Sequence, residues 1–115
     1  IKMKQTEMLK KNYEFKKVLT KGHFYLGKQL KIVILKNRKN CKLLGIAVST
    51  KNGKAFQRNR LKRLIRESYK TLEEQIEIGY SIIVLIKKEI CLNNVKYKDI
   101  LEDMKNIFEE AKILK

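Results

Sequence analysis

Cationic side chains gather between residues 51 and 66, and they are the strongest chemical feature of the sequence. The residues of this run that can contact a phosphate, a sugar or a base edge are Lys51, Lys54, Arg58, Asn59, Arg60, Lys62, Arg63 and Arg66. An arginine guanidinium can donate two parallel hydrogen bonds to one phosphate, and an asparagine amide can reach a sugar or a base edge. The run therefore predicts binding of a polyanion, with nucleic acid as the first candidate.

Helical geometry would place these cations on one continuous surface. At 100° per residue, Leu61, Leu64, Ile65, Ser68 and Leu72 form a narrow apolar stripe, and the cations occupy most of the remaining arc. Neighbouring like charges four residues apart each cost an isolated helix a few tenths of a kcal/mol, so a ligand that neutralises them is expected. The plainer alternative is a solvated basic helix without a ligand.

The turn before this helix adds to the same surface. Lys51, Gly53 and Lys54 allow a phosphate to come close to the backbone. The N–H groups at a helix start carry partial positive charge and bind anions. Turn and helix together predict an anion-binding cradle.

Overall charge and length support one nucleic-acid-binding domain. The 115 residues hold 28 Lys plus Arg and 12 Asp plus Glu, a formal charge of +16. We expect a single RNA-binding domain over residues 1–115, with residues 1–8 as a flexible arm. No segment approaches the roughly 20 apolar residues of a membrane span, and the first residues lack a secretory signal pattern. The expected location is the cytoplasm, without a membrane partner.

Catalytic and metal-binding constellations are not expected. His23 is the only histidine, and it falls at a predicted helix-to-strand junction where a surface role is the simpler interpretation. Without another histidine, no Ser/His/Asp or Cys/His set forms a convincing pattern. Acidic residues cluster where solvated faces explain them. We therefore predict no catalytic residues and no metal site in the protein, which should be inert on its own.

The pattern along the chain predicts an α+β fold. Helices are expected at 13–21, after an N-cap at Asn12, then from about 55 to 75 and from about 100 to 111. Strands are expected at 24–36, where Gly27 can break the strand, at 44–49 and at 80–86. The prediction is one central mixed β-sheet packed with three helices, in the order α-β-β-(β)-α-β-α.

Residues 51–67, KNGKAFQRNRLKRLIRE, resemble the signature of the bacterial ribonuclease P protein subunit. The similarity extends to residues 9–12 with Phe15 and Gly22, to residues 45–49 and to residues 81–88, so it covers essentially the whole chain. The resemblance implies a fold like domain 2 of ribosomal protein S5. It also implies a left-handed βαβ crossover through the basic helix, although right-handed crossovers are the general rule.

The same resemblance implies a function. In that family a catalytic RNA, with magnesium ions (Mg2+) bound mainly by RNA, removes the 5′ leader of precursor tRNA, and the protein assists. The cations of residues 51–66 and Asn59 would contact the RNA subunit. Phe15 and Lys87 or Lys88 would line a cleft for the single-stranded leader, although Leu19 and Val33 stand where aromatic residues are expected. The implied partners are the RNA subunit and precursor tRNA, with no obligate protein partner.

Two other functional hypotheses are consistent with the charge and size of this chain. A ribosomal or ribosome-assembly RNA-binding protein would have the same architecture without a part in cleavage. A helix-based DNA-binding protein would use residues 58–66 as its recognition helix, although the surrounding strands argue against it.

Overall fold

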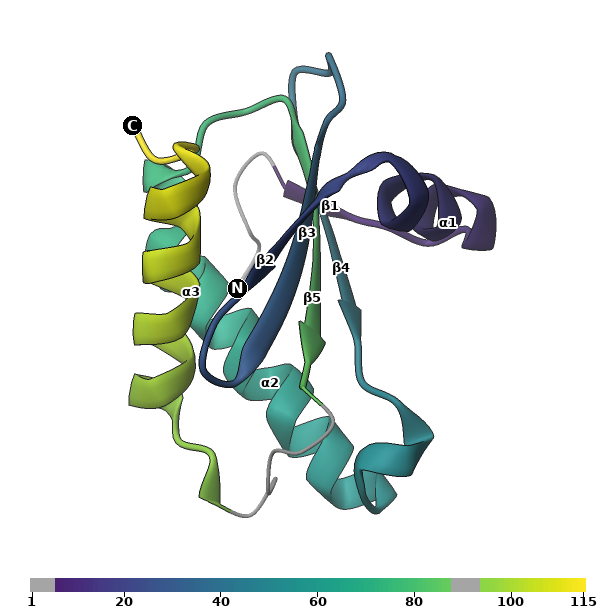
Figure 1. The fold of residues 1–115 in the computed structure, drawn as a ribbon, viewed down its shortest axis with the longest axis vertical. Coiled ribbons are helices and arrows are strands. Elements are labelled where there is room, and N and C mark those ends of the chain that lie inside the picture. The colour runs from purple at the N-terminus through teal and green to yellow at the C-terminus, as the bar shows by residue number, and fades with distance from the viewer. Residues whose placement is uncertain (1–5, 88–93) are drawn as a thin grey trace.

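A five-stranded mixed sheet organises the chain in the computed structural model, which describes residues 6–87 and 94–115 (Figure 1). The strands are β1 (Thr6–Met8), β2 (His23–Leu26), β3 (Leu30–Lys36), β4 (Lys42–Ala47) and β5 (Tyr80–Ile86). Their order across the sheet is β1-β4-β5-β3-β2. Strand β4 is parallel to β1 and to β5, whereas β3 is antiparallel to β2 and to β5.

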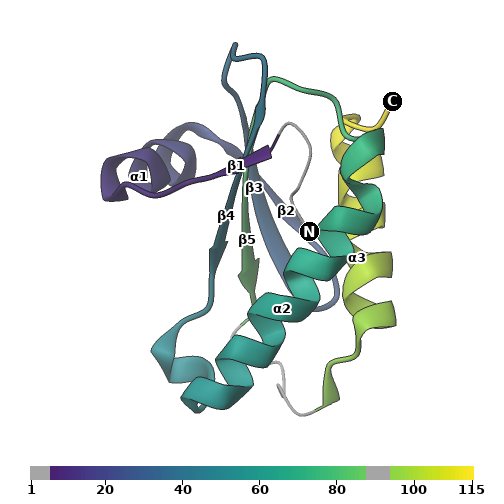
Figure 2. The ribbon, with the colours of Figure 1, turned by 180° about the vertical axis from the view of Figure 1, so that it is seen from behind.

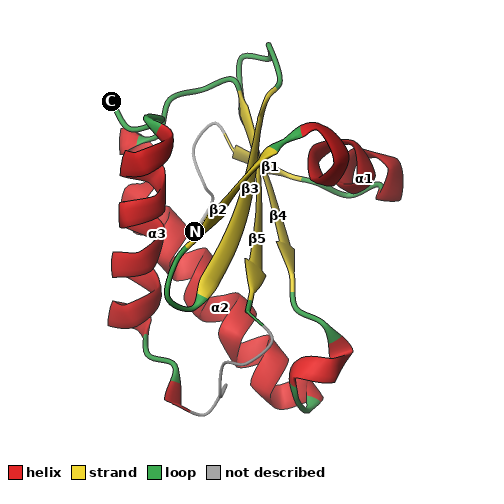
Figure 3. Ribbon diagram, viewed as in Figure 1, coloured by secondary structure: helices red, strands yellow, loops and turns green. Residues whose placement is uncertain are grey.

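Three helices pack on the two faces of this sheet. Helix α1 (Asn12–Lys21) lies on one face, and α2 (Ala55–Leu72) and α3 (Tyr97–Ala111) lie on the other (Figures 1 and 3). Short 3-10 turns at Thr50–Asn52 and Glu73–Gln75 flank α2. Within the described part of the chain, no helix has the length and apolar character needed to span a membrane. The predicted α+β class, with one mixed sheet and three helices, is confirmed.

The connection from β4 through α2 to β5 has the left-handed sense that the resemblance implied. Figure 2 shows the sheet nearly edge-on, with β4 and β5 both running downward, β4 to the left of β5, and α2 to their right and in front. A right-handed connection would place β5 on the other side of β4. The basic helix is therefore the crossover helix of a left-handed βαβ unit.

Alternation along the strands divides the core into two parts. The larger part fills the space between the sheet and helices α2 and α3, and includes Ile32, Ile82 and Val84. The smaller part lies beneath α1 and consists of Leu9, Val18, Val33, Leu43 and Ile83. Because β3 and β5 are covered on both faces, they read as nearly continuous apolar runs in the sequence.

The N-terminal region corrects two predictions. Thr6–Met8 is not part of a flexible arm, because it forms β1 and pairs in parallel with Lys42–Leu44 at the edge of the sheet. The first element is thus a strand that precedes α1. Helix α1 also begins one residue earlier than predicted: Lys11, not Asn12, is the N-cap, and its N–H donates to the Glu14 carboxylate at 3.2 Å.

The segment 24–36, predicted as a strand that Gly27 can break, is a β2–β3 hairpin whose turn is held by Asp103 of α3. This carboxylate accepts the backbone N–H groups of Lys28 at 2.8 Å, Gln29 at 3.0 Å and Leu30 at 2.8 Å. Asp103 is only 5% exposed. A side chain at Gly27 would collide with that carboxylate, so the glycine makes room for the contact. The sequence pattern alone contains no sign of this long-range interaction.

Two buried polar groups fasten α2 to β1 and β4. The Tyr69 hydroxyl lies 3.0 Å from Thr6 Oγ1, and Lys42 Nζ donates to the backbone carbonyl of Glu73 at 2.5 Å. Burial raises the pKa of Tyr69 well above its ordinary value, and burial lowers the pKa of Lys42. These contacts fix the orientation of the basic helix on the sheet.

Candidate nucleic-acid interface

The start of α2 is shaped by a turn that combines basic side chains with an unusual backbone. Ser49 Oγ accepts the Lys51 N–H at 3.2 Å and begins the 3-10 turn. Gly53 follows with φ +145°, a conformation that residues with a Cβ rarely adopt. Lys54 is the N-cap of α2, and its N–H donates to Gln57 Oε1 at 2.8 Å. Lys51 and Lys54 are both exposed beside this helix start.

Part of the Arg58 guanidinium is already used within the protein. Its Nη1 donates to the Gly53 carbonyl at 2.6 Å, and the side chain is half-buried. Arg58 therefore ties the first helical turn to the loop before it. The guanidinium has further N–H groups that this bond does not use.

The outer surface of α2 carries the remaining cations. Asn59, Arg60, Arg63 and Arg66 are exposed, whereas Leu61, Ile65, Ser68, Tyr69 and Leu72 are buried against the sheet and α3. Asn59, Arg63 and Arg66 follow one another at helical spacing, so they share one face. Lys62 is half-buried and lies beside the sheet, where it lines a groove.

On the α1 side of the sheet, side chains form three rows that run across the strands, because paired residues project to the same face. The upper row is Leu43, Ser81 and Leu35; the middle row is Gly45, Ile83, Val33 and Phe24; the lower row is Ala47, Leu85, Lys31 and Leu26. Successive rows are about 6.7 Å apart, two residues along a strand. The rows define where α1 covers the sheet and where it does not.

Helix α1 sits over the middle row. A Cβ on Gly45 would lie 2.7 Å from Phe15 Cε1 and 2.8 Å from its Cζ, so the ring occupies the space that glycine leaves. Val33 and Ile83 are fully buried under this helix together with Val18. Phe15 is half-buried. It therefore has one edge in the small core and part of its surface toward solvent.

The lower row is left uncovered and forms the floor of a groove of about 700 Å³. Its lining joins the sheet face to the turn and the helix: Leu26, Lys31, Ile46, Ala47, Val48, Ser49, Lys62, Leu85, Ile86 and Lys87. Lys87 is fixed at the end of β5, where its N–H donates to the Gln29 carbonyl at 2.9 Å. Lys88, predicted beside it, lies outside the described residues. The structure thus brings Lys62 and Lys87 to one groove.

Sequence reasoning missed three residues of this open face. Phe24 is 50% exposed and Leu26 is 64% exposed, and Lys31 Nζ lies 4.8 Å from the centre of the Phe24 ring. Phe24 pairs across the strands with Val33, which is fully buried. The aromatic surface that Val33 cannot supply is therefore present on the adjacent strand. The only available signal was the alternation in residues 23–26, which does not tell which side faces solvent.

Other chemistry is sparse in the described part of the chain. His23 is exposed at the start of β2. Among residues 6–87 and 94–115, no three His, Cys, Asp or Glu side chains are placed to hold a metal ion together. Fold and surface together define a class: a small basic α+β protein whose left-handed crossover helix presents its cations beside an open, partly aromatic sheet face.

Comparison with known proteins identifies the family within this class. The sequence model of the family described as Ribonuclease P matches residues 3–112. The ribonuclease P protein component of Clostridioides difficile (strain 630) is 38% identical over 110 residues, covering 95% of each chain. That of Fusobacterium nucleatum subsp. nucleatum is 40% identical over 108 residues, covering 92% of this chain and 97% of the relative.

Solved structures agree with the sequence comparison. The RNase P protein of Staphylococcus aureus superimposes with a TM-score of 0.80 at 30% identity, covering 94% of this chain and 97% of that one. The RNase P protein of Thermotoga maritima gives a TM-score of 0.82 at 27% identity, covering 90% and 96%. The chain belongs to the family of bacterial ribonuclease P protein components. Membership implies a part in tRNA processing and partnership with an RNA subunit.

Proposed function

We propose that this chain is the protein subunit of a ribonuclease P ribonucleoprotein that binds both the catalytic RNA and the 5′ leader of precursor tRNA. In this role it promotes endonucleolytic removal of the leader. The observation that carries the proposal is the continuity of the two surfaces: Lys62 belongs to the cationic helix α2 and also lines the groove over the lower row. One protein can therefore hold two RNA segments side by side.

The RNA subunit is assigned to the outer face of α2 and its preceding turn. Lys51, Lys54, Asn59, Arg60, Arg63 and Arg66 are exposed there, and phosphate contacts of this kind supply most of the sequence-independent affinity for RNA. Arg58 serves in part by keeping the turn in place through Gly53. Such contacts position a folded RNA by shape and charge and require no particular sequence.

The leader is assigned to the groove over the lower row of the sheet, beside α2. A single strand is held by cations along its phosphates and by aromatic side chains under its bases, and each stacked base contributes about 1 to 3 kcal/mol. Lys62 and Lys87 supply the charge in the groove, and Phe15 and Phe24 supply aromatic surface on the neighbouring row. Stacking tolerates many sequences, which suits leaders that differ between tRNAs.

The chemistry itself is assigned to the RNA. Magnesium ions bound by the RNA subunit would activate the water and stabilise the leaving group. The protein's contribution in this proposal is to bind and orient the RNA and to neutralise its charge. A ribonucleoprotein of this kind would act in the cytoplasm, and the isolated protein would not cleave precursor tRNA.

Reconstitution with a bacterial ribonuclease P RNA and precursor tRNA at low magnesium tests this function directly. The protein should stimulate leader removal, and it should produce no product without the RNA. Changing Arg63 and Arg66 together to alanine should weaken binding to the RNA subunit and reduce the slope of log affinity against log salt by roughly 1.5. The matched control is Lys98→Ala with Lys105→Ala, because these lysines lie on α3, away from the proposed surface. Absence of stimulation, or equal losses in both double variants, would refute the assignment.

A second experiment separates the leader groove from the basic helix. Phe24→Ala should reduce affinity for precursor tRNA in the presence of the RNA subunit by about fivefold, roughly 1 kcal/mol, and leave affinity for mature tRNA unchanged. Ile78→Ala removes another exposed apolar side chain far from the groove and serves as control. An equal loss for precursor and mature tRNA would exclude Phe24 from leader binding.

A further inference from the structure

A second hollow lies on the other side of α1, between that helix and the loop that joins β3 to β4. Its volume is about 420 Å³ and its floor includes the upper row of the sheet. Because α1 covers the middle row, the helix separates this hollow from the groove beside α2. The function proposed above leaves this hollow without a role.

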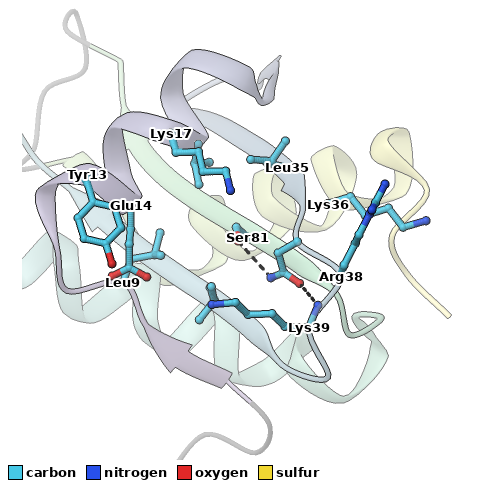
Figure 4. Close-up of a pocket in the computed structure, with 12 residues that line it drawn as sticks. Leu9, Tyr13, Glu14, Lys17, Leu35, Lys36, Arg38, Lys39 and Ser81 are labelled. Carbon is cyan, nitrogen blue, oxygen red and sulfur yellow. Dashed lines mark hydrogen bonds between the residues drawn. The ribbon is translucent and has the colours of Figure 1, made fainter.

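Two amino groups enter the hollow from opposite walls. Figure 4 shows Lys17 of α1 and Lys39 of the loop with their amines directed inward, whereas the head groups of Lys36 and Arg38 turn outward. All four side chains are exposed. Glu14 is the one acidic residue among the described residues that line the hollow, and its carboxylate accepts the Lys11 N–H at the start of α1. The surroundings of the hollow are therefore strongly positive.

The floor of the hollow combines apolar surface with polar groups that can form hydrogen bonds with a base. Leu9, Leu35 and Leu43 supply the apolar part. The Asn37 amide donates to Ser81 Oγ at 3.1 Å, and its oxygen accepts the Lys39 N–H at 2.9 Å (Figure 4). Amide and hydroxyl groups in such positions retain further donor and acceptor capacity for a ligand.

The loop that carries Lys39 is held in place before any ligand arrives. The Asn37 N–H donates to the Gly79 carbonyl at 2.8 Å, and the Gly79 N–H donates to the Cys41 carbonyl at 3.1 Å. These bonds fasten both ends of the loop to the segment that leads into β5. A hollow formed in advance binds its ligand without first ordering the loop.

We infer that this hollow binds one nucleotide of single-stranded RNA. Its phosphate lies between the Lys17 and Lys39 amines, and its base rests on the leucine floor beside Asn37 and Ser81. The size suits one base with its sugar and phosphate. Lys36 and Arg38, directed outward, neutralise the phosphates of the adjoining nucleotides. A strand is favoured over a free nucleotide because these two outward cations would contact nothing on a single nucleotide.

The test uses the free protein and a fluorescent single-stranded RNA oligonucleotide, so that it does not depend on the RNA subunit or on tRNA. Lys17→Gln with Lys39→Gln keeps most of each side chain but removes both charges. This double variant should bind the oligonucleotide about tenfold more weakly, with a salt slope lower by about one. Lys16→Gln with Lys105→Gln is the charge-matched control on exposed sites outside the hollow. Glu14→Gln should act in the opposite direction and tighten binding about threefold.

Three results would overturn the inference. The first is an equal loss in the control and in the Lys17/Lys39 variant, which would show that net charge alone matters. The second is competition by adenosine monophosphate at the concentration at which the oligonucleotide itself binds, which would assign the hollow to a free nucleotide. The third is the absence of oligonucleotide-induced shifts in the amide resonances of Lys39 and Ser81. Because thermal unfolding of each variant is measured alongside, a loss of fold is separated from a loss of binding.

Discussion

Replacement of Asp103 tests whether α3 controls the geometry of the open sheet face from the opposite side of the sheet. The buried carboxylate accepts three backbone N–H groups of the β2–β3 turn. That turn connects Leu26 with Lys31, and its Gln29 carbonyl accepts the N–H of Lys87. One carboxylate thus fixes the turn that holds the groove residues Leu26, Lys31 and Lys87 in position.

The cost can be worked from these contacts. A hydrogen bond to a charged group contributes about 1.5 kcal/mol at the lower end of the measured range, so Asp103→Ala should lose about 4 to 5 kcal/mol. It also leaves the buried N–H of Leu30 without its acceptor. In Asp103→Asn one oxygen can keep the bonds to Gln29 and Leu30, but the new NH₂ group faces the N–H of Lys28. About half of the loss is then expected, 2 to 3 kcal/mol.

Thermal unfolding followed by circular dichroism measures both variants. For a chain of this length each kcal/mol lowers Tm by about 4 °C, so the alanine variant should unfold about 15 to 20 °C below the parent and the asparagine variant about 10 °C below. Glu102→Gln, an exposed neighbour on the same helix, is the control and should unfold with the parent protein. A Tm for Asp103→Ala within about 3 °C of the parent would refute the reasoning, because it would mean that water replaces the carboxylate at little cost.

Two further predictions concern α1 and α2. Gly45→Ala places a methyl group within 3 Å of the Phe15 ring and should displace that ring. We expect a stability loss of about 1 to 3 kcal/mol and a larger loss of affinity for precursor tRNA than for mature tRNA. Equal losses of affinity for the two tRNAs would contradict this prediction. Tyr69→Phe should cost about 1 kcal/mol at neutral pH through the lost bond to Thr6. Since burial raises the folded pKa of Tyr69, the unfolded chain releases its proton first as pH rises above the ordinary value near 10, and the parent protein loses stability there. Urea unfolding across that range should show a shallower decline for Tyr69→Phe, and parallel declines would count against a buried hydroxyl.

The elements that could be predicted from sequence are those with a regular local pattern of apolar residues. The periodicity of residues 55–72 and the apolar run 80–86 predicted α2 and β5 closely, because in each the buried face repeats at a fixed spacing. Strand β1 was missed because three residues are too short to show a period. The β2–β3 turn was missed as a turn because its carboxylate comes from residue 103, more than seventy positions away.

The residues of the candidate site also differ in whether local sequence pattern could predict them. The cations of α2 are visible in sequence because an amphipathic helix must expose the side chains that it does not bury. Phe24 and Lys31 could not be assigned to an open surface, because their exposure depends on how far α1 extends over the sheet. In residues 23–26 the alternation is equally compatible with Phe24 or Tyr25 facing the core. Only the register with β3 decides it.

The acidic residues are distributed unevenly over the molecule. Of the 12 Asp and Glu residues, five lie on α3, namely Asp99, Glu102, Asp103, Glu109 and Glu110, and three more, Glu73, Glu74 and Glu77, follow α2. The first half of α2 carries none. Because like charge repels a phosphate backbone, an RNA approaching this protein is steered to the start of α2 and to the α1 face of the sheet, and α3 is left facing away from it. The groove beside α2 and the hollow beyond α1 both lie on the favoured side, and the Gly45–Phe15 contact that seats α1 between them determines the extent of each.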